Sequence, residues 1–260
     1  MNHQQNNPGN RLLAALPAED LEKLTPHLKL VPMEVGAVLH EANKPITHVY
    51  FPTTSTLSLV STMEDGRSTA VATIGNDGLA GVPIFMGGDR TSSEIVVQGA
   101  GAGYRLNASV ARMESTRCGE LQRWAMRYAQ ALFTEMAQTA VCNRLHTMEQ
   151  QLCRWLLLST YHSSSKSIVV TQRLIANTLG TRREAIAEAA SRLRGANLIQ
   201  CGRGYVSIVD RPRLEAHACE CYASAKKEVD RLLPYRTGTA SISRLSTAPG
   251  KLVRDSATAP

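Results

Sequence analysis

The stretch TQRLIANTLGTRREAIAEAASRLR, residues 171–194, decides the fold of the C-terminal half. A short helix that Thr171 can cap comes first, and Gly180 follows it where a tight turn is required. The spacing Thr181-x-x-Glu184 is that of a capping box, which predicts that Thr181 caps a second helix. Two helices joined by a short turn that contains glycine form a helix-turn-helix.

The apolar and polar residues of this unit fall on different faces. We expect the inner face to consist of Ile175, Leu179, Ile186, Ala190 and Leu193. The opposite side of the second helix is polar and has arginines at its N-terminal end, where the helix dipole favours phosphate. Such a helix suits the major groove of DNA. The residues that we expect to contact DNA are Thr171, Gln172, Thr181, Arg182, Arg183, Glu184, Glu188, Arg192 and Arg203.

The next segment, NLIQCGRGYVSIV (197–209), predicts two short strands around the turn Cys201-Gly202-Arg203-Gly204. A helix-turn-helix followed by a hairpin is a winged helix, and the tip of such a wing typically lies along the sugar-phosphate backbone. The alternative is an ordinary pair of helices in a globular protein. The capping box, the wing and the local charge together favour the winged helix.

The charge of the chain is divided unevenly along its length. Residues 1–144 hold 12 Lys and Arg against 13 Asp and Glu, whereas residues 145–236 hold 14 against 8. A basic half joined to a neutral half indicates separate roles, and the basic half has the electrostatic character of a polyanion binder. By charge alone, a solvated basic surface is an equally good explanation.

The N-terminal half has a different pattern. Residues 11–28 predict one or two short helices, and from about residue 30 to residue 106 short β-branched stretches alternate with Gly, Asn and Asp turns. Short strands at near-regular spacing predict a small sandwich or barrel-like roll. The segment 63–67, MEDGR, is the clearest hairpin turn.

Residues 120–143 contain no Gly or Pro and predict a long helix with two neighbouring apolar stripes. Together the stripes cover more than half of the circumference, whereas a helix on a domain surface needs about 100°. One stripe can pack on the roll and the other on a symmetry-related helix; burial within one chain is the alternative. We expect the dimer interface to contain Leu121, Trp124, Tyr128, Leu132, Met136 and Ala140.

These patterns predict an α+β protein with a jelly-roll-like N-terminal β-roll, a long dimerisation helix and a C-terminal winged helix-turn-helix domain. The expected boundaries are 11–117 for the roll, 118–145 for the helix, 146–225 for the DNA-binding domain and 237–260 for a disordered tail.

The chain resembles transcription regulators of the Crp/Fnr family over roughly residues 11–225. The most specific segments are GTRREAI at 180–186, NLI at 197–199 with the Gly-Arg-Gly wing, and DGLAG at 77–81. The resemblance implies that Arg183 and Glu184 read base edges. It also places Glu188 where the cyclic-AMP-responsive branch often has Arg, which implies a different operator preference.

The same resemblance implies an effector site in the roll, with two departures. Cyclic-nucleotide binders of this family have Gly-Glu-Leu followed by Arg-Ser/Thr-Ala, whereas this chain has Leu79 in place of the Glu and has Asp89 beside the Arg. We therefore expect no control by cyclic AMP; another ligand, or a ligand-free scaffold, remains open. The residues in the two corresponding segments are Gly78, Leu79, Gly81, Arg90, Thr91 and Ser92.

Other chemistry finds little support in the sequence. The family's iron–sulfur branch uses an N-terminal Cys cluster, but the first Cys here is Cys118. Cys219 and Cys221 are two residues apart, so on a helix they would not share a face, and we expect no metal or cofactor. His27, His40 and His48 form no known ligand motif and are expected to lie at the surface. Neither a catalytic triad nor a nucleotide loop is present, so no enzyme is expected.

We expect a cytoplasmic regulator, because the polar N-terminus is not a secretory signal and no apolar run is long enough for a membrane span. Its expected partners are double-stranded DNA, a second copy of the chain, RNA polymerase if it is an activator, and an unidentified small-molecule effector. The alternative is a metabolite-sensing adaptor whose helical domain binds protein rather than DNA.

Overall fold

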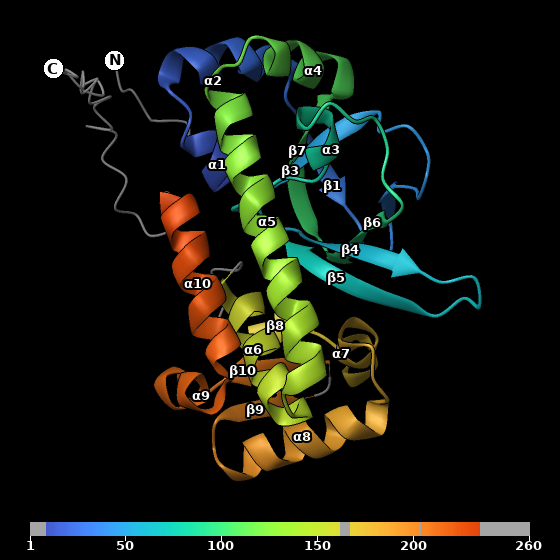
Figure 1. The fold of residues 1–260 in the computed structure, drawn as a ribbon, viewed down its shortest axis with the longest axis vertical. Helices are drawn as coiled ribbons and strands as arrows, with labels where there is room; N and C mark the ends of the chain where they lie inside the picture. Colours follow the sequence, from blue (N-terminus) through green and yellow to red (C-terminus); the bar gives the residue numbers. More distant parts are fainter. Residues whose placement is uncertain (1–8, 162–166, 203, 235–260) are drawn as a thin grey trace, which may run out of the picture.

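The computed structural model describes residues 9–161, 167–202 and 204–234. A β-roll lies at one end of the long helix α5 (Glu120–Leu145), and a winged helix-turn-helix lies at the other (Figure 1). Helix α10 (Glu220–Leu232) runs beside α5. The expected α+β class and the order of its parts are confirmed. The tail expected at 237–260 lies outside the described residues.

The roll contains two antiparallel sheets. The first has the order β1-β7-β3 and consists of β1 (Lys29–Met33), β7 (Gly101–Asn107) and β3 (His48–Pro52). The second has the order β2-β6-β4-β5 and consists of β2 (Val38–His40), β6 (Glu94–Gly99), β4 (Thr56–Thr62) and β5 (Ser68–Ile74). The short helices around these sheets are α1 (Arg11–Ala14), α2 (Ala18–Leu24), η1 (Thr25–His27), α3 (Val82–Phe85) and α4 (Ala108–Thr116).

The hairpin predicted at 63–67 joins β4 to β5. The Met63 backbone N–H donates to the Arg67 carbonyl at 2.8 Å, and Gly66 has a φ of 81°, which a glycine adopts without strain. Large apolar side chains from both sheets, among them Phe51, Leu57 and Leu106, form the core of the roll. The alternation of short apolar stretches and turn residues was therefore sufficient to predict this architecture.

The C-terminal domain combines helices with a small sheet. Its helices are α6 (Met148–Tyr161), α7 (Gln172–Leu179), α8 (Arg183–Gly195) and α9 (Arg211–His217). The sheet has the order β8-β10-β9 and consists of β8 (Ser167–Val169), β10 (Tyr205–Ile208) and β9 (Ile199–Gly202). The sequence pattern did not predict β8, because a strand of three residues has almost no periodicity of its own. This strand is defined by its antiparallel pairing with β10, which lies far from it in the sequence.

Candidate nucleic-acid interface

Helix α7 begins and ends as its sequence indicates. The Thr171 side chain accepts a hydrogen bond from the Leu174 backbone N–H at 3.2 Å, which makes Thr171 the N-cap. Gly180 ends the helix in the left-handed region, with φ 63° and ψ 35°. The Thr181 N–H donates to the Ala176 carbonyl at 2.9 Å, so the turn satisfies a carbonyl that the helix end leaves free.

The capping box predicted at the start of α8 is wrong. The helix begins at Arg183, and Arg182 is its N-cap, without a side-chain capping hydrogen bond. The backbone of Thr181 is still occupied in closing α7, so the turn extends one residue further than the Thr-x-x-Glu spacing indicates. Glu184 nevertheless falls in the first turn of α8, where the helix dipole stabilises a carboxylate.

The predicted inner face of the helix-turn-helix is present. Ile175, Ile186, Ala190 and Leu193 are buried, and Leu179 packs against the same core cluster while partly buried. The opposite side of α8 is exposed and includes Arg182, Arg183, Glu184, Glu188 and Arg192. In Figure 1, α8 crosses the end of the molecule away from the roll.

The arginines of α8 differ in their electrostatic surroundings. Arg192 donates hydrogen bonds to Glu149 and Glu188, each at 2.7 Å, and these interactions raise its pKa. Two carboxylates thus compensate the charge of Arg192, which we had expected to contact DNA. Within the described part of the chain, neither Arg182 nor Arg183 has a carboxylate partner. Arg194, in the last turn of α8, likewise has no carboxylate partner among the described residues, so α8 has uncompensated arginines at both ends, and Arg182 and Arg183 are those at its N-terminal end.

A cleft of about 410 Å³ separates the start of α7, the start of α8 and the wing. Three of the predicted residues, Thr171, Gln172 and Arg183, line it. The exposed residues Arg173 and Tyr205 line it as well, and neither was among the predicted contacts. Its position two residues after the Thr171 cap was a usable signal for Arg173, whereas only the pairing of the wing strands places Tyr205. Arg203, predicted at the wing tip, lies outside the described residues.

The predicted effector residues do not form one site. Leu79, Gly81 and Thr91 line a cavity of about 150 Å³ in the roll. Arg90 and Ser92 are exposed and do not line this cavity, and Arg90 donates two hydrogen bonds to the Asp89 carboxylate, at 3.0 and 3.3 Å. Gly78 has a packing role, because any Cβ there would overlap the ring of Tyr128. Gly78, Arg90 and Ser92 therefore lie outside the cavity that the other three residues line, and their role in binding an effector stays a prediction.

The roll cavity is mostly apolar. Leu79 is fully buried and presents no hydrogen-bond acceptor, and Leu132 of α5 closes one side. His40 also lines the cavity with only 5% of its surface exposed, which corrects the expectation that it lies at the surface. Its Nε2 donates to the His48 carbonyl at 2.8 Å, and burial lowers the pKa of His40.

Part of the predicted dimer interface is instead core. Leu121, Trp124 and Tyr128 are buried within the chain and belong to the core cluster of the roll. Leu132 is partly buried against the same cluster. The stripe that contains Leu121, Trp124 and Tyr128 therefore packs on the roll. The sequence pattern alone did not show which of the two stripes would do so. Met136 is half-buried, and Ala140 is exposed.

The second stripe of α5 is exposed. Phe133 has 72% of its surface exposed, Val141 45% and Met126 40%, and Ala137 and Ala140 lie between them. At 100° per residue these positions fall within a sector of about 100°, opposite the buried stripe. The exposed Gln130 lies in the same sector, so the surface is mostly, but not entirely, apolar. An exposed apolar patch of this kind marks an interaction site.

Comparisons with known proteins agree with this architecture. Residues 150–217 match the family model described as a Crp-like helix-turn-helix domain. FixK2 from Bradyrhizobium japonicum has a similar structure, with a TM-score of 0.66 at 14% identity over 74% of this chain and 98% of that chain. A CRP-family transcriptional regulator from Thermus thermophilus, TTHB099, gives a TM-score of 0.60 at 15% identity, covering 72% and 96% of the respective chains.

The c-di-GMP-responsive global regulator CLP from Xanthomonas campestris gives a TM-score of 0.56 at 13% identity, covering 75% of this chain and all of that chain. No curated protein matches the sequence. Among the residues that the structure describes, no helix has both the length and the apolar character needed to span a bilayer. Residues 150–217 match a Crp-like helix-turn-helix domain, and the chain has the same fold as solved structures of Crp/Fnr-family regulators.

Proposed function

We propose that this protein is a sequence-specific DNA-binding transcription regulator that binds a two-fold-symmetric operator as a homodimer. The observation that carries the proposal is the exposed N-terminal end of α8, where Arg182 and Arg183 lack carboxylate partners in the described chain. A recognition helix of this type contacts base edges through its N-terminal residues. The match of residues 150–217 to a Crp-like helix-turn-helix domain supports the same conclusion.

The contacts divide into two groups by their position. Arg183 and Glu184 lie in the first turn of α8 and are the proposed base-reading residues, with Arg182 beside them. Thr171, Gln172 and Arg173 lie at the start of α7, where backbone N–H groups and the helix dipole favour phosphate. Arg203 stays a sequence-based proposal for a phosphate contact. Glu188 and Arg192 form an ion pair at 2.7 Å, so we assign them a weaker role.

The exposed stripe of α5 supports the proposed homodimer. Phe133, Ala137, Ala140 and Val141 would pack against the same residues of a second copy, as an isologous two-fold interface requires. A dimer of this kind presents two α8 helices, and a palindromic operator mirrors that symmetry. If the regulator activates transcription, RNA polymerase is a further partner.

We propose that cyclic AMP does not control this regulator. Leu79 offers no acceptor to a ribose hydroxyl, and Arg90 is held outside the cavity by Asp89. The cavity, at about 150 Å³, is also smaller than the roughly 300 Å³ at which ligand pockets begin. An unidentified effector would therefore have to be small and largely apolar, or would have to open the roll.

The test is selection of DNA in vitro from a random pool with the full-length protein, followed by sequencing of the bound fraction. We expect a motif with two inverted half-sites whose centres lie one helical turn apart, about 34–36 Å. Fluorescence anisotropy with the selected DNA and with a scrambled duplex then gives the specificity ratio at a stated salt concentration.

An enriched pool without any motif, together with equal affinity for both duplexes, would refute sequence-specific binding. If the full-length protein retains no DNA at all, even at low salt, the metabolite-sensing adaptor becomes the better description.

A further inference from the structure

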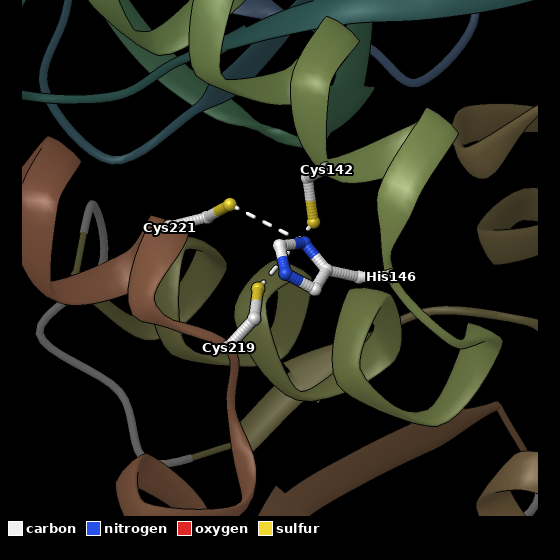
Figure 2. A group of neighbouring side chains, drawn as sticks. All are labelled: Cys142, His146, Cys219 and Cys221. Carbon is white, nitrogen blue, oxygen red and sulfur yellow. Dashed lines mark hydrogen bonds between the residues drawn. The ribbon is translucent and has the colours of Figure 1, made fainter.

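Four potential metal ligands from two distant segments meet at one point of the fold. Cys142 lies in the last turn of α5, and His146 is the residue that caps this helix. Cys219 is the N-cap of α10, and Cys221 lies in the first turn of that helix. The ligand atoms of the four residues all lie within 4.8 Å of one another, and Figure 2 shows the imidazole ring among the three sulfur atoms.

The expectation that Cys219 and Cys221 cannot face one site is wrong. It assumed that both residues are helical, but Cys219 precedes α10 with an extended backbone, at φ −74° and ψ 164°. The extended residue allows both thiols to turn towards the end of α5. Their partners, Cys142 and His146, are more than seventy positions earlier in the chain, so no local spacing pattern shows the set.

The distances fit a single tetrahedral ion. The Cys142 and Cys219 sulfurs are 3.5 Å apart, and the Cys221 sulfur is 3.4 Å from Nδ1 of His146. A tetrahedral zinc ion with ordinary bond lengths separates two sulfur ligands by about 3.8 Å, and a sulfur from a nitrogen by about 3.6 Å. An iron–sulfur cluster holds its cysteine sulfurs farther apart, because several irons and sulfides lie between them.

The surroundings of His146 also suit a metal ligand. Its Nδ1 faces the thiols, while its Nε2 lies 3.4 Å from a carboxylate oxygen of Glu220. Histidines that bind a metal typically donate their other ring N–H to a carboxylate, which fixes the tautomer and orients the ring. The site is enclosed: Cys142, Cys219 and Cys221 are buried, and the His146 side chain is only 14% exposed.

We propose that Cys142, His146, Cys219 and Cys221 bind one zinc ion per chain in a closed structural site. Three thiolates and one imidazole form a standard donor set for zinc, and four protein ligands leave no open position for water or substrate. The soft sulfur donors disfavour magnesium and calcium.

The position of the site gives the ion a mechanical role. The C-terminal end of α10 is held near the roll, where Arg127 of α5 donates to the Leu232 carbonyl at 2.7 Å and Val229 enters the roll core. The zinc site fastens the N-terminal end of α10 to the junction between α5 and α6. Bound zinc would therefore keep both ends of α10 attached, one to the roll and the other to the α5–α6 junction, and would limit movement between the roll and the C-terminal domain.

The experiment uses the full-length protein purified under reducing conditions, and elemental mass spectrometry measures its metal content. We expect about one zinc ion per chain. Cobalt added to protein stripped of metal should produce the visible absorption of tetrahedral Co²⁺ and a sulfur-to-cobalt charge-transfer band. Cys219→Ser and His146→Ala should lose the ion, whereas Cys118→Ser, at an exposed cysteine outside the cluster, should retain it.

A ligand variant that fails to fold does not end the test. Cys221→His keeps four donors, so it should retain bound metal with a weaker sulfur-to-cobalt band. Hydrogen exchange of the wild-type protein should slow around residues 142–147 and 218–224 when zinc is added. A metal content below about one ion per ten chains, both as purified and after addition of zinc, would overturn the proposal. A Cys142–Cys219 disulfide in the protein purified under reducing conditions would overturn it as well.

None of these measurements involves DNA, so the zinc site stands or falls separately from the proposed function. Failure of DNA binding in a zinc-loaded protein would count against the proposed function alone.

Discussion

The hydroxyl of Thr69, on β5 of the roll, donates a hydrogen bond to the backbone carbonyl of Thr178 near the end of α7, at 3.2 Å. The two residues are 109 positions apart, so this contact joins the roll to the helix-turn-helix directly. Helix α7 packs on β5 around this point. The roll therefore fixes the orientation of the DNA-binding domain through α7 as well as through α5.

Removal of this hydrogen bond should weaken DNA binding. Thr69→Val keeps the shape of the side chain but removes the donor, at a net cost of about 0.5–1.5 kcal/mol for a typical hydrogen bond. A less fixed DNA-binding domain should lower operator affinity roughly two- to tenfold, measured by fluorescence anisotropy. Thr116→Val is the control, because the Thr116 hydroxyl also donates to a main-chain carbonyl but does so within α4. Unchanged or increased affinity of Thr69→Val would contradict this role.

Arg183→Ala should reduce affinity by about 1–3 kcal/mol per half-site and relax the preference at one base position. The physical reason is that Arg183 begins α8, where side chains reach base edges. Competition binding against operators changed at single positions measures both effects. Arg194→Ala, in the last turn of the same helix, is the matched control and should leave the base preference unaltered. Loss of preference in Arg194→Ala but not in Arg183→Ala would reverse the assignment.

Phe133→Glu should convert the protein to a monomer. Its side chain is 72% exposed in the middle of the apolar stripe of α5, and a charge there would face the same charge across a two-fold axis. Light scattering at micromolar concentration measures the mass, and operator binding should fall with it. Ala223→Glu, an exposed position on α10, should remain dimeric. A monomeric wild-type protein in the same experiment would exclude the proposed interface.

Cyclic AMP and cyclic GMP should not bind with micromolar affinity. The buried Leu79 leaves a ribose hydroxyl unpaired, which costs about 1–3 kcal/mol, and the small cavity would have to expand. Titration calorimetry with both nucleotides, followed by anisotropy with operator DNA, checks the prediction. Micromolar binding together with a gain in operator affinity would show that the roll is a nucleotide sensor after all.

Burial of His40 should make stability depend on pH. Burial lowers the pKa of His40 below the ordinary value of about 6.5. At a pH between the lowered pKa and about 6.5, the unfolded chain therefore binds more protons than the folded chain. The free energy of unfolding should therefore be highest above about pH 6.5 and should decrease as the pH falls below it. Urea titrations between about pH 7 and pH 5 measure this decrease.

His40→Gln should flatten that dependence, since the amide can still donate to the His48 carbonyl but does not titrate in this range. A residual slope is expected from His48, whose pKa burial also lowers, with Arg105 and Lys29 adding to the effect. His27→Gln, at an exposed position in η1, is the control and should preserve the full slope. If His40→Gln retains the wild-type slope, the titration of His40 does not contribute.

The sequence by itself determined those features whose causes are local. The cap at Thr171, the left-handed turn at Gly180 and the inner face of the helix-turn-helix follow from the conformational preferences and spacing of neighbouring residues. The β4–β5 hairpin and the strands of the roll follow in the same way from alternation and turn residues. Even here, the N-cap of α8 was misplaced by one residue, because the closure of α7 extends the turn.

Only the tertiary structure decided the features that depend on what a side chain meets across the fold. Both stripes of α5 are apolar, and packing on the roll selected the one with Leu121 and left Phe133 exposed. The fold of the roll likewise places Leu79 at the cavity and leaves Arg90 outside it. The meeting of Cys142 with Cys219 required the whole path of the chain between them. Local preferences act over a few residues, whereas burial and ligand geometry depend on contacts between segments far apart in sequence.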